Sequence, residues 1–161
     1  MTTVEVGQTL VDFYQDRLAL RLRHEAGACL VSSYEFNNAY QYVIAREDVH
    51  LTWLLNALDG FGRSAPDVER PALPESGRDR EASIIADDAQ SAGAFVERWR
   101  PRVDGLGHAR HRKMLSIILG ETLEHKRVFD QAAAGRTDLL GRRPAGAGTG
   151  GGVRSNRSAV G

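Results

Sequence analysis

The sequence predicts an all-α protein, an antiparallel four-helix bundle with one long crossover between its second and third helices. Apolar side chains recur with a period near 3.6 in four stretches of about 20 residues, and no stretch shows the alternation typical of a strand. Four of the five prolines lie between residues 66 and 101, which leaves the segments on either side free to form long helices. A chain of 161 residues suits a single domain, which we expect over residues 1–140.

The first two helices are expected to form a hairpin. The first should run from about Thr9, a favourable N-cap residue, to Ser33, and the second from about Asn38 to Asp59. A short turn between them makes the two helices antiparallel. The apolar stripes that define them are Val11, Tyr14, Leu18 and Leu22 in the first, and Tyr40, Val43, Ile44, Leu51, Leu54 and Leu58 in the second.

Residues 60–78 are expected to connect this hairpin to a second one. The segment contains three prolines and three glycines, which argues against a helix or strand of its own. When extended it can reach about 60 Å, whereas a helix of 20 residues is about 30 Å long, so it can cross the whole bundle. The third helix should then cover about 79–100, closed by residues 101–107, and the fourth about 108–134.

Composition and charge exclude several classes of protein. Residues 141–161 contain seven glycines, four arginines and no acidic residue, which predicts a flexible tail and leaves residues 1–140 with a net charge of −4. That charge argues against general nucleic-acid binding. The single cysteine, Cys29, excludes an internal disulfide framework, no apolar run is long enough to span a membrane, and the N-terminus lacks the features of a secretory signal. We therefore expect a cytoplasmic protein.

Ionisable side chains interrupt all four apolar stripes at similar heights. An i, i+3 Glu–His pair lies on the second helix, an i, i+4 pair lies on the fourth, and the other two helices each contribute one acidic residue. Converging carboxylates at 4 Å repel by about 4 kcal/mol even at an effective dielectric of 20, a cost that a divalent cation removes. Carboxylate and imidazole ligands without a thiolate suit iron, manganese or zinc. The candidate ligands are Glu25, Glu47, His50, Asp88, Glu121 and His125.

Two stretches of the sequence resemble a known family. Residues 45–55, Ala-Arg-Glu-Asp-Val-His-Leu-Thr-Trp-Leu-Leu, are similar to the second helix of ferritin-like, rubrerythrin-type proteins, and residues 120–129 are similar to their fourth helix. The resemblance implies a ferritin-like bundle with a di-iron carboxylate site, or a site for manganese or zinc. It also implies oxidation of Fe(II) by dioxygen or peroxide, and hence an oxidoreductase or metal-handling protein.

The same resemblance implies a role for each candidate ligand. Glu47 and a glutamate of the fourth helix would bridge the two metals. His50 and His125 would be terminal nitrogen ligands. Glu25 and Asp88 would each cap one metal. These roles come from the family pattern, whereas the residues themselves were selected by their positions on the helical stripes.

The sequence departs from the family pattern in three of its four helices. Thr122 stands three residues before the fourth-helix histidine, where a glutamate is usual. Because of these departures an alternative function stays open, a metal-free helical bundle that serves as a binding or assembly module. The ligand choices that stay open are Glu121 or Glu124 in the fourth helix, Asp88 or Asp87 in the third, and Glu25 or Glu35 in the first.

Basic residues cluster where the third helix turns into the fourth. Together with the cationic tail, this cluster suits an anionic partner, and the alternative module would use it for binding. A homodimer is one possible assembly of the chain. The residues expected at the anionic partner are Arg98, Arg100, Arg102, Arg110 and Arg112.

Overall fold

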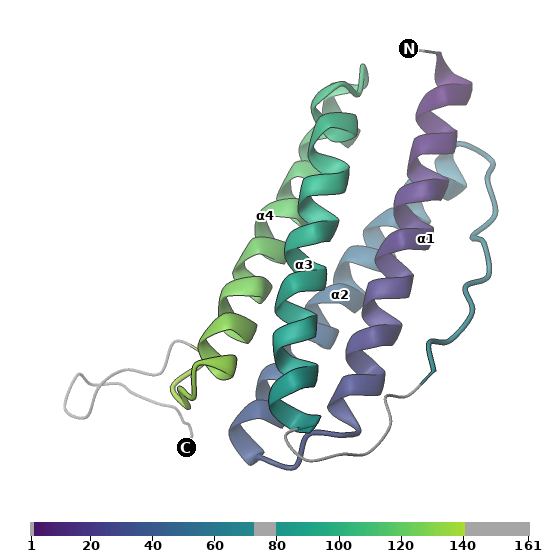
Figure 1. The fold of residues 1–161 in the computed structure, drawn as a ribbon. Helices are drawn as coiled ribbons and strands as arrows, with labels where there is room; N and C mark the ends of the chain where they lie inside the picture. Colours follow the sequence, from purple (N-terminus) through teal and green to yellow (C-terminus); the bar gives the residue numbers. More distant parts are fainter. Residues whose placement is uncertain (1, 73–79, 141–161) are drawn as a thin grey trace, which may run out of the picture.

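The protein is described by a computed structural model that covers residues 2–72 and 80–140. Within these residues it contains four α-helices and no strand, and the helices pack as a bundle, which confirms the predicted fold class (Figure 1). The predicted tail, 141–161, lies outside the described residues. The helices are α1 (Thr3–Ala28), α2 (Tyr34–Gly60), α3 (Arg80–Asp104) and α4 (Ala109–Ala133).

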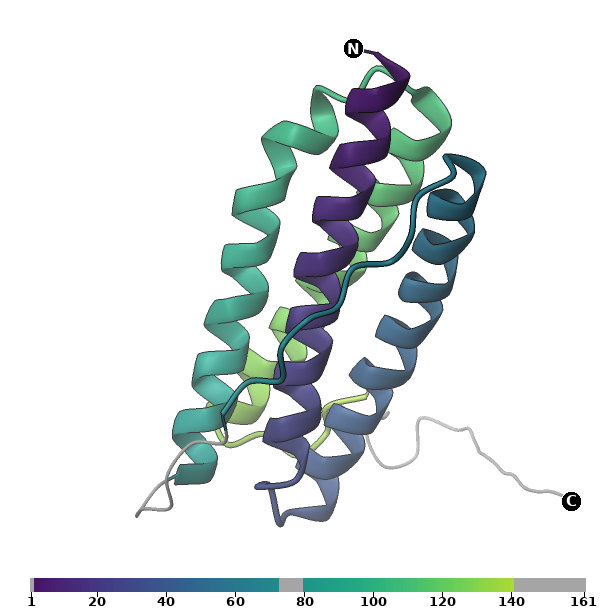
Figure 2. The ribbon, with the colours of Figure 1, turned by 90° about the vertical axis from the view of Figure 1, so that its right-hand side faces the viewer.

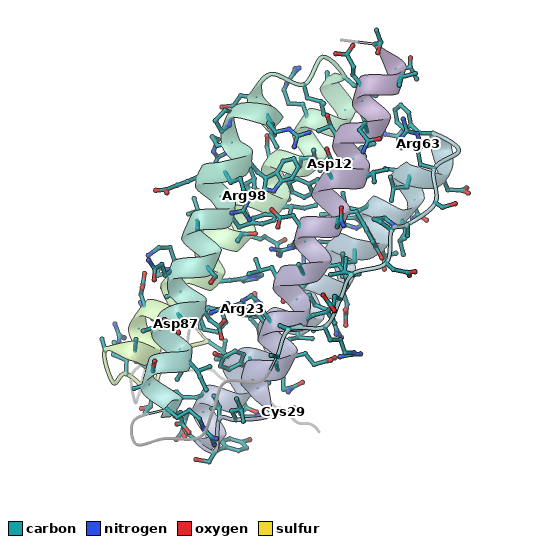
Figure 3. All side chains as sticks on the ribbon, turned by 45° about the vertical axis from the view of Figure 1, so that its right-hand side comes forward. Asp12, Arg23, Cys29, Arg63, Asp87 and Arg98 are labelled. Carbon is teal, nitrogen blue, oxygen red and sulfur yellow. The ribbon has the colours of Figure 1, made fainter. Side chains whose placement is uncertain are left out.

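The helices form two hairpins that pack side by side. Helix α1 packs against α2 and α3, and α4 packs against α3 and α2. The described part of the connector after α2 runs along the outside of α1 toward the opposite end of the bundle (Figure 2). Arg63 fastens its start, because it donates to the carbonyl oxygen of Val4 and to Gln8 in the first turns of α1 (Figure 3). The connector therefore makes the predicted long crossover.

Four helix boundaries differ from those expected, among them the start of α2, which lies at Tyr34 and not at about Asn38. Helix α1 begins earlier because Thr2 and Glu5 form a capping box, and it ends earlier because Ser33 is the N-cap of α2. Helix α3 continues through Pro101 to Asp104, so the expected end near residue 100 is wrong. A proline near the end of a helix removes a single backbone donor, and the extra turn places Val103 in the core, where it is fully buried.

The apolar core is divided into two clusters along the bundle axis. One contains Leu10, Phe13, Leu54 and Leu115, and the other contains Val43, Ile85, Phe129 and their neighbours. Between them on α1, α2 and α4 lie most of the buried polar side chains. No helix of the described residues is both long and apolar enough to cross a membrane. The buried polar residues of this region, which we call the polar layer, are Arg17, His24, Glu47, His50, Thr122 and His125.

Candidate functional site

The guanidinium of Arg17 is the centre of the polar layer. The side chain is fully buried. One terminal nitrogen donates to Thr122 Oγ1 at 3.0 Å and lies 3.7 Å from Glu47 Oε2, and the other lies 2.9 Å from His50 Nδ1. Because a guanidinium can only donate, His50 Nδ1 accepts, and the proton of the neutral ring is on Nε2. Thr122 can accept because its own hydroxyl donates to the carbonyl oxygen of Ile118.

Glu47 carries the negative charge that faces Arg17. Its carboxylate is fully buried, and Oε1 lies 2.8 Å from His24 Nδ1 of α1. Burial by itself would raise the pKa of Glu47, but the charges of His24 and Arg17 and the hydrogen bond with His24 hold the pKa below its ordinary value. Glu47 is therefore ionised at neutral pH, and the layer contains a buried ion pair between α1 and α2.

The other two histidines of the layer are neutral at neutral pH. Burial and the positive charge of Arg17 lower the pKa of His50 to about 4 and the pKa of His125 to about 3. Their rings are nearly parallel, with centroids 6.3 Å apart, and they come from α2 and α4. The layer thus contains neutral imidazole nitrogen atoms, the form in which histidine binds metals.

Glu121 lies at the edge of the layer and is held from two sides. It accepts two hydrogen bonds from the guanidinium of Arg46, at 3.0 and 2.7 Å, and its Oε2 lies 3.0 Å from His50 Nε2. The hydrogen bonds from Arg46 lower the pKa of Glu121. Four of the six candidate ligands, two from α2 and two from α4, therefore meet in or beside the layer, as the stripe positions predicted.

Asp88, one of the two remaining candidate ligands, lies apart from the layer. It is buried between α3 and α1, where it accepts hydrogen bonds from the hydroxyl of Tyr40 and from Arg23 Nε, the latter at 3.0 Å. Burial and the Asp88 carboxylate raise the pKa of Tyr40. Asp88 is thus part of a structural hydrogen-bond cluster. Gly27 of α1 lies beside it, and a Cβ atom there would come within 3.0 Å of Asp88 Oδ2.

Glu25 lies at the surface, where it pairs with Arg21 of α1 and Arg70 of the connector. Its proposed alternative, Glu35, accepts from the hydroxyl of Ser33 at the start of α2. In helix α4, Glu124 is exposed and pairs with Arg127, and in α3 Asp87 is exposed. None of these alternatives brings a carboxylate into the polar layer.

The side chains of the layer do not fit a di-metal centre as they are arranged. The guanidinium of Arg17 lies beside Glu47 and His50 and supplies the positive charge that a metal would supply. Both ring nitrogens of His50 face other groups of the protein, and Glu121 is bound in a bidentate manner. Among residues 2–72 and 80–140, no three His, Cys, Asp or Glu side chains are grouped to hold a metal ion. Metal binding by the six candidates stays a prediction.

Sequence reasoning missed three members of the layer, namely Arg17, His24 and Thr122. A signal for two of them exists on α1, because residues 10, 13, 17, 20 and 24 share one helical face with spacings of three and four. Leu10 and Phe13 on that face are fully buried. The stripe chosen from the sequence, which includes Val11 and Leu18, lies next to this face, and those two side chains are only partly buried.

The basic turn between α3 and α4 is partly neutralised within the protein. Arg98 pairs with Asp16, and Arg102 pairs with Asp12 and lies over the ring of Trp99, so both basic side chains tie α3 to α1 (Figure 3). Arg112 donates to the carbonyl oxygen of Leu106. The cations of this turn without an acidic partner among the described residues are Arg100, Arg110, Arg112 and Lys113.

A cavity of about 410 Å³ opens at the same end of the bundle, between the end of α2 and the start of α4. We call it the α2–α4 pocket. It is lined by both aromatic and basic side chains. Its main lining residues are Trp53, Phe61, His108, Arg110, His111 and Met114.

Comparison with known proteins supports the fold and leaves the activity open. No protein-family model and no curated protein matches the sequence. The structure is similar to that of a conserved hypothetical protein, Rv2844, from Mycobacterium tuberculosis, with a TM-score of 0.67, 15% sequence identity, and coverage of 92% of this chain and 99% of that chain. The similarity extends over nearly the whole bundle, and at this identity it concerns the fold alone.

Proposed function

We propose that this protein is a metal-free helical-bundle binding module whose binding end is the α3–α4 turn. The observation that carries the first half of the proposal is the buried guanidinium of Arg17 within the polar layer. It lies 3.7 Å from the Glu47 carboxylate, a separation at which opposite charges attract by about 4 kcal/mol at an effective dielectric of 20. A charge of the chain itself thus stabilises the buried carboxylate, and no metal ion is needed for that purpose.

Under this proposal the buried carboxylate of the polar layer already has a cationic partner within the chain. His50 and His125 are neutral, and Arg17 and Glu47 compensate each other. A divalent cation that entered the layer would face the positive charge of Arg17 at short range. Metal binding would therefore require the Arg17 side chain to leave its position between Thr122 and His50, at the cost of two buried hydrogen bonds.

Thermal melts of the wild type with Fe(II), Mn(II), Zn(II) or a chelator test this half of the proposal. A ligand that binds only the native state raises the melting temperature, so identical melts under all four conditions, with no metal found by elemental analysis of the purified protein, are expected. A chelator-induced drop together with near-stoichiometric metal would contradict the proposal. The wild type is used for this test because Glu47→Gln leaves the buried charge of Arg17 without its anionic partner. That variant is therefore destabilised with or without metal.

A ferritin-like oxidoreductase or metal-handling protein is the second candidate function. It is favoured by two atoms of the predicted ligand set, Glu47 Oε2 and His125 Nδ1, which are buried and make no hydrogen bond among the described residues. Those atoms come from α2 and α4, the helices that carry the resemblance to rubrerythrin-type proteins. The metal analysis above separates the two candidates directly.

The second half of the proposal assigns an anionic partner to the α3–α4 turn. Arg110 and Lys113 are exposed and have no acidic partner among the described residues, so their charges are available. Binding to an immobilised polyanion such as polyglutamate should weaken in the Arg110→Gln and Lys113→Gln double variant. A matched control, the Arg127→Gln and Arg136→Gln double variant, removes two cations that already pair with Glu124 and Asp138. Equal losses in both variants would indicate that net charge alone determines binding.

A further inference from the structure

The α2–α4 pocket has one aromatic side and one basic side. Trp53 and Phe61, from the last turns of α2 and its C-cap, and Met114 of α4 supply apolar surface. His108, which is the N-cap of α4, and Arg110 and His111 in its first turn supply donors and positive charge. Its volume of about 410 Å³ lies within the usual range of small-molecule sites, roughly 300–1,000 Å³.

Three rings lie in contact, tilted relative to one another, along one part of this pocket. The centroids of Phe61 and His111 lie 5.4 Å apart, and those of His108 and His111 lie 4.3 Å apart. His108 Nδ1 accepts a hydrogen bond from the backbone N–H of His111, and this bond orients the His108 ring. The two imidazoles are therefore held beside the ring of Phe61, so the pocket has aromatic surface next to nitrogen donors.

The pocket is electropositive. None of its lining residues is acidic. Burial lowers the pKa of His111, and the neighbouring positive charges of His108 and Arg110 lower it further. His111 Nδ1 is shielded from solvent and makes no hydrogen bond among the described residues. An anion in the pocket would face the positive charge of Arg110 and supply a hydrogen-bond acceptor for His111.

We propose that the α2–α4 pocket binds a small aromatic anion, a planar ring that carries a phosphate or carboxylate group. The ring lies against Trp53, Phe61 and Met114, and the anionic group faces Arg110 and the two histidines. Arginine suits this role because its planar guanidinium can form paired hydrogen bonds to phosphate and carboxylate oxygens. This inference rests on the proposed function only in that both place the binding end at the α3–α4 turn.

Calorimetric titration of the full chain with 1-naphthyl phosphate tests the proposal. Binding should be at least about tenfold tighter than that of inorganic phosphate, which lacks the ring, and that of 1-naphthol, which lacks the charge. 1-Naphthoate, titrated in parallel, distinguishes a phosphate site from a carboxylate site. Equal affinity for 1-naphthol, or for inorganic phosphate, would overturn the assignment of an aromatic anion.

A pair of matched variants locates the binding site. Arg110→Gln should weaken the binding of 1-naphthyl phosphate by about tenfold or more, because it removes the charged donor from the pocket. Lys113→Gln, which removes an equal charge from the same turn of α4 but outside the pocket lining, should weaken it less than about twofold at physiological salt. Equal effects of the two variants would refute a site in the pocket.

The ionisation of His111 gives an independent readout. In an NMR titration of the wild type, saturating 1-naphthyl phosphate should raise the pKa of His111, and an unchanged pKa would contradict the proposed geometry. These outcomes are separable from the metal question. Bound metal together with Arg110-dependent binding of 1-naphthyl phosphate would reject the metal-free module and keep the pocket assignment. If neither bound metal nor Arg110-dependent binding of 1-naphthyl phosphate is found, the pocket assignment is rejected and the metal-free module is kept.

Discussion

Replacement of Arg17 by methionine is the most direct test of how the interior of the bundle is held together. Arg17→Met keeps an unbranched side chain that can still pack against Phe95, whose ring lies 5.4 Å from the guanidinium carbon. It removes the positive charge, the hydrogen bond to Thr122 and the donor to His50 Nδ1. The fold remains the same, and only the electrostatics of the polar layer change.

The expected loss of stability follows from the groups left behind. Glu47 stays fully buried and, among the residues that the structure describes, keeps only His24 as a hydrogen-bond partner. Removing one partner of a buried ion pair costs about 3–5 kcal/mol, and the hydrogen-bond acceptor left on His50 adds to this loss. We expect a decrease of about 4 kcal/mol in the free energy of unfolding, out of about 5–15 kcal/mol for a typical domain. The melting temperature should fall by about 10 °C or more.

Urea unfolding followed by circular dichroism measures this loss. The Arg17→Met, Glu47→Gln double variant removes both charges at nearly constant shape, so it should recover a large part of the stability, with a coupling energy of about 2 kcal/mol or more. Arg21→Met is the matched control, because Arg21 makes ion pairs at the surface of the same helix and should contribute about 1 kcal/mol at most. If Arg17→Met were no more destabilising than Arg21→Met, the role of Arg17 as an internal counter-ion would be refuted.

Two further predictions follow from the interior. Gly27→Ala should destabilise the protein by about 1–2 kcal/mol despite the better helix propensity of alanine, because its Cβ would lie 3.0 Å from Asp88 Oδ2. Gly120→Ala should instead stabilise the protein by about 0.5–1 kcal/mol, because Gly120 is an exposed helical glycine with open space around it. Urea unfolding measures both changes, and changes of the same sign in the free energy of unfolding of the two variants would disprove this reasoning. In the folded protein the pKa is about 4 for His50 and about 3 for His125, whereas both histidines have a pKa of 6.5 in the unfolded chain. As the pH falls, these histidines are therefore protonated in the unfolded chain before they are protonated in the folded protein. The free energy of unfolding should then decrease between pH 6.5 and 4, by about 3 kcal/mol per histidine at pH 4. Unfolding curves that stay constant from pH 7 to 4.5 would show that the two histidines are not held neutral.

The sequence by itself determined the four helices and the polar positions on α2 and α4. Both are local properties, because a period of 3.6 places Glu47 and His50 on the same face as the apolar residues that must be buried. Those two residues and His125 are indeed buried together with Thr122 in one layer. The connector was equally predictable, since proline and glycine act on the backbone at their own positions.

Only the tertiary structure decided which residues of α1 complete the layer and what neutralises it. The apolar face of α1 is broad, and the angle at which α1 packs against α2 and α3 determines whether Arg17 or Leu18 points inward. Arg17 is fully buried, while Leu18 is only partly so. Asp88 likewise found its partners, Tyr40 and Arg23, on other helices. Ion pairs and hydrogen bonds between helices depend on side-chain positions that helical periodicity does not contain, and for this reason the charge balance of the interior emerged only from the packed bundle.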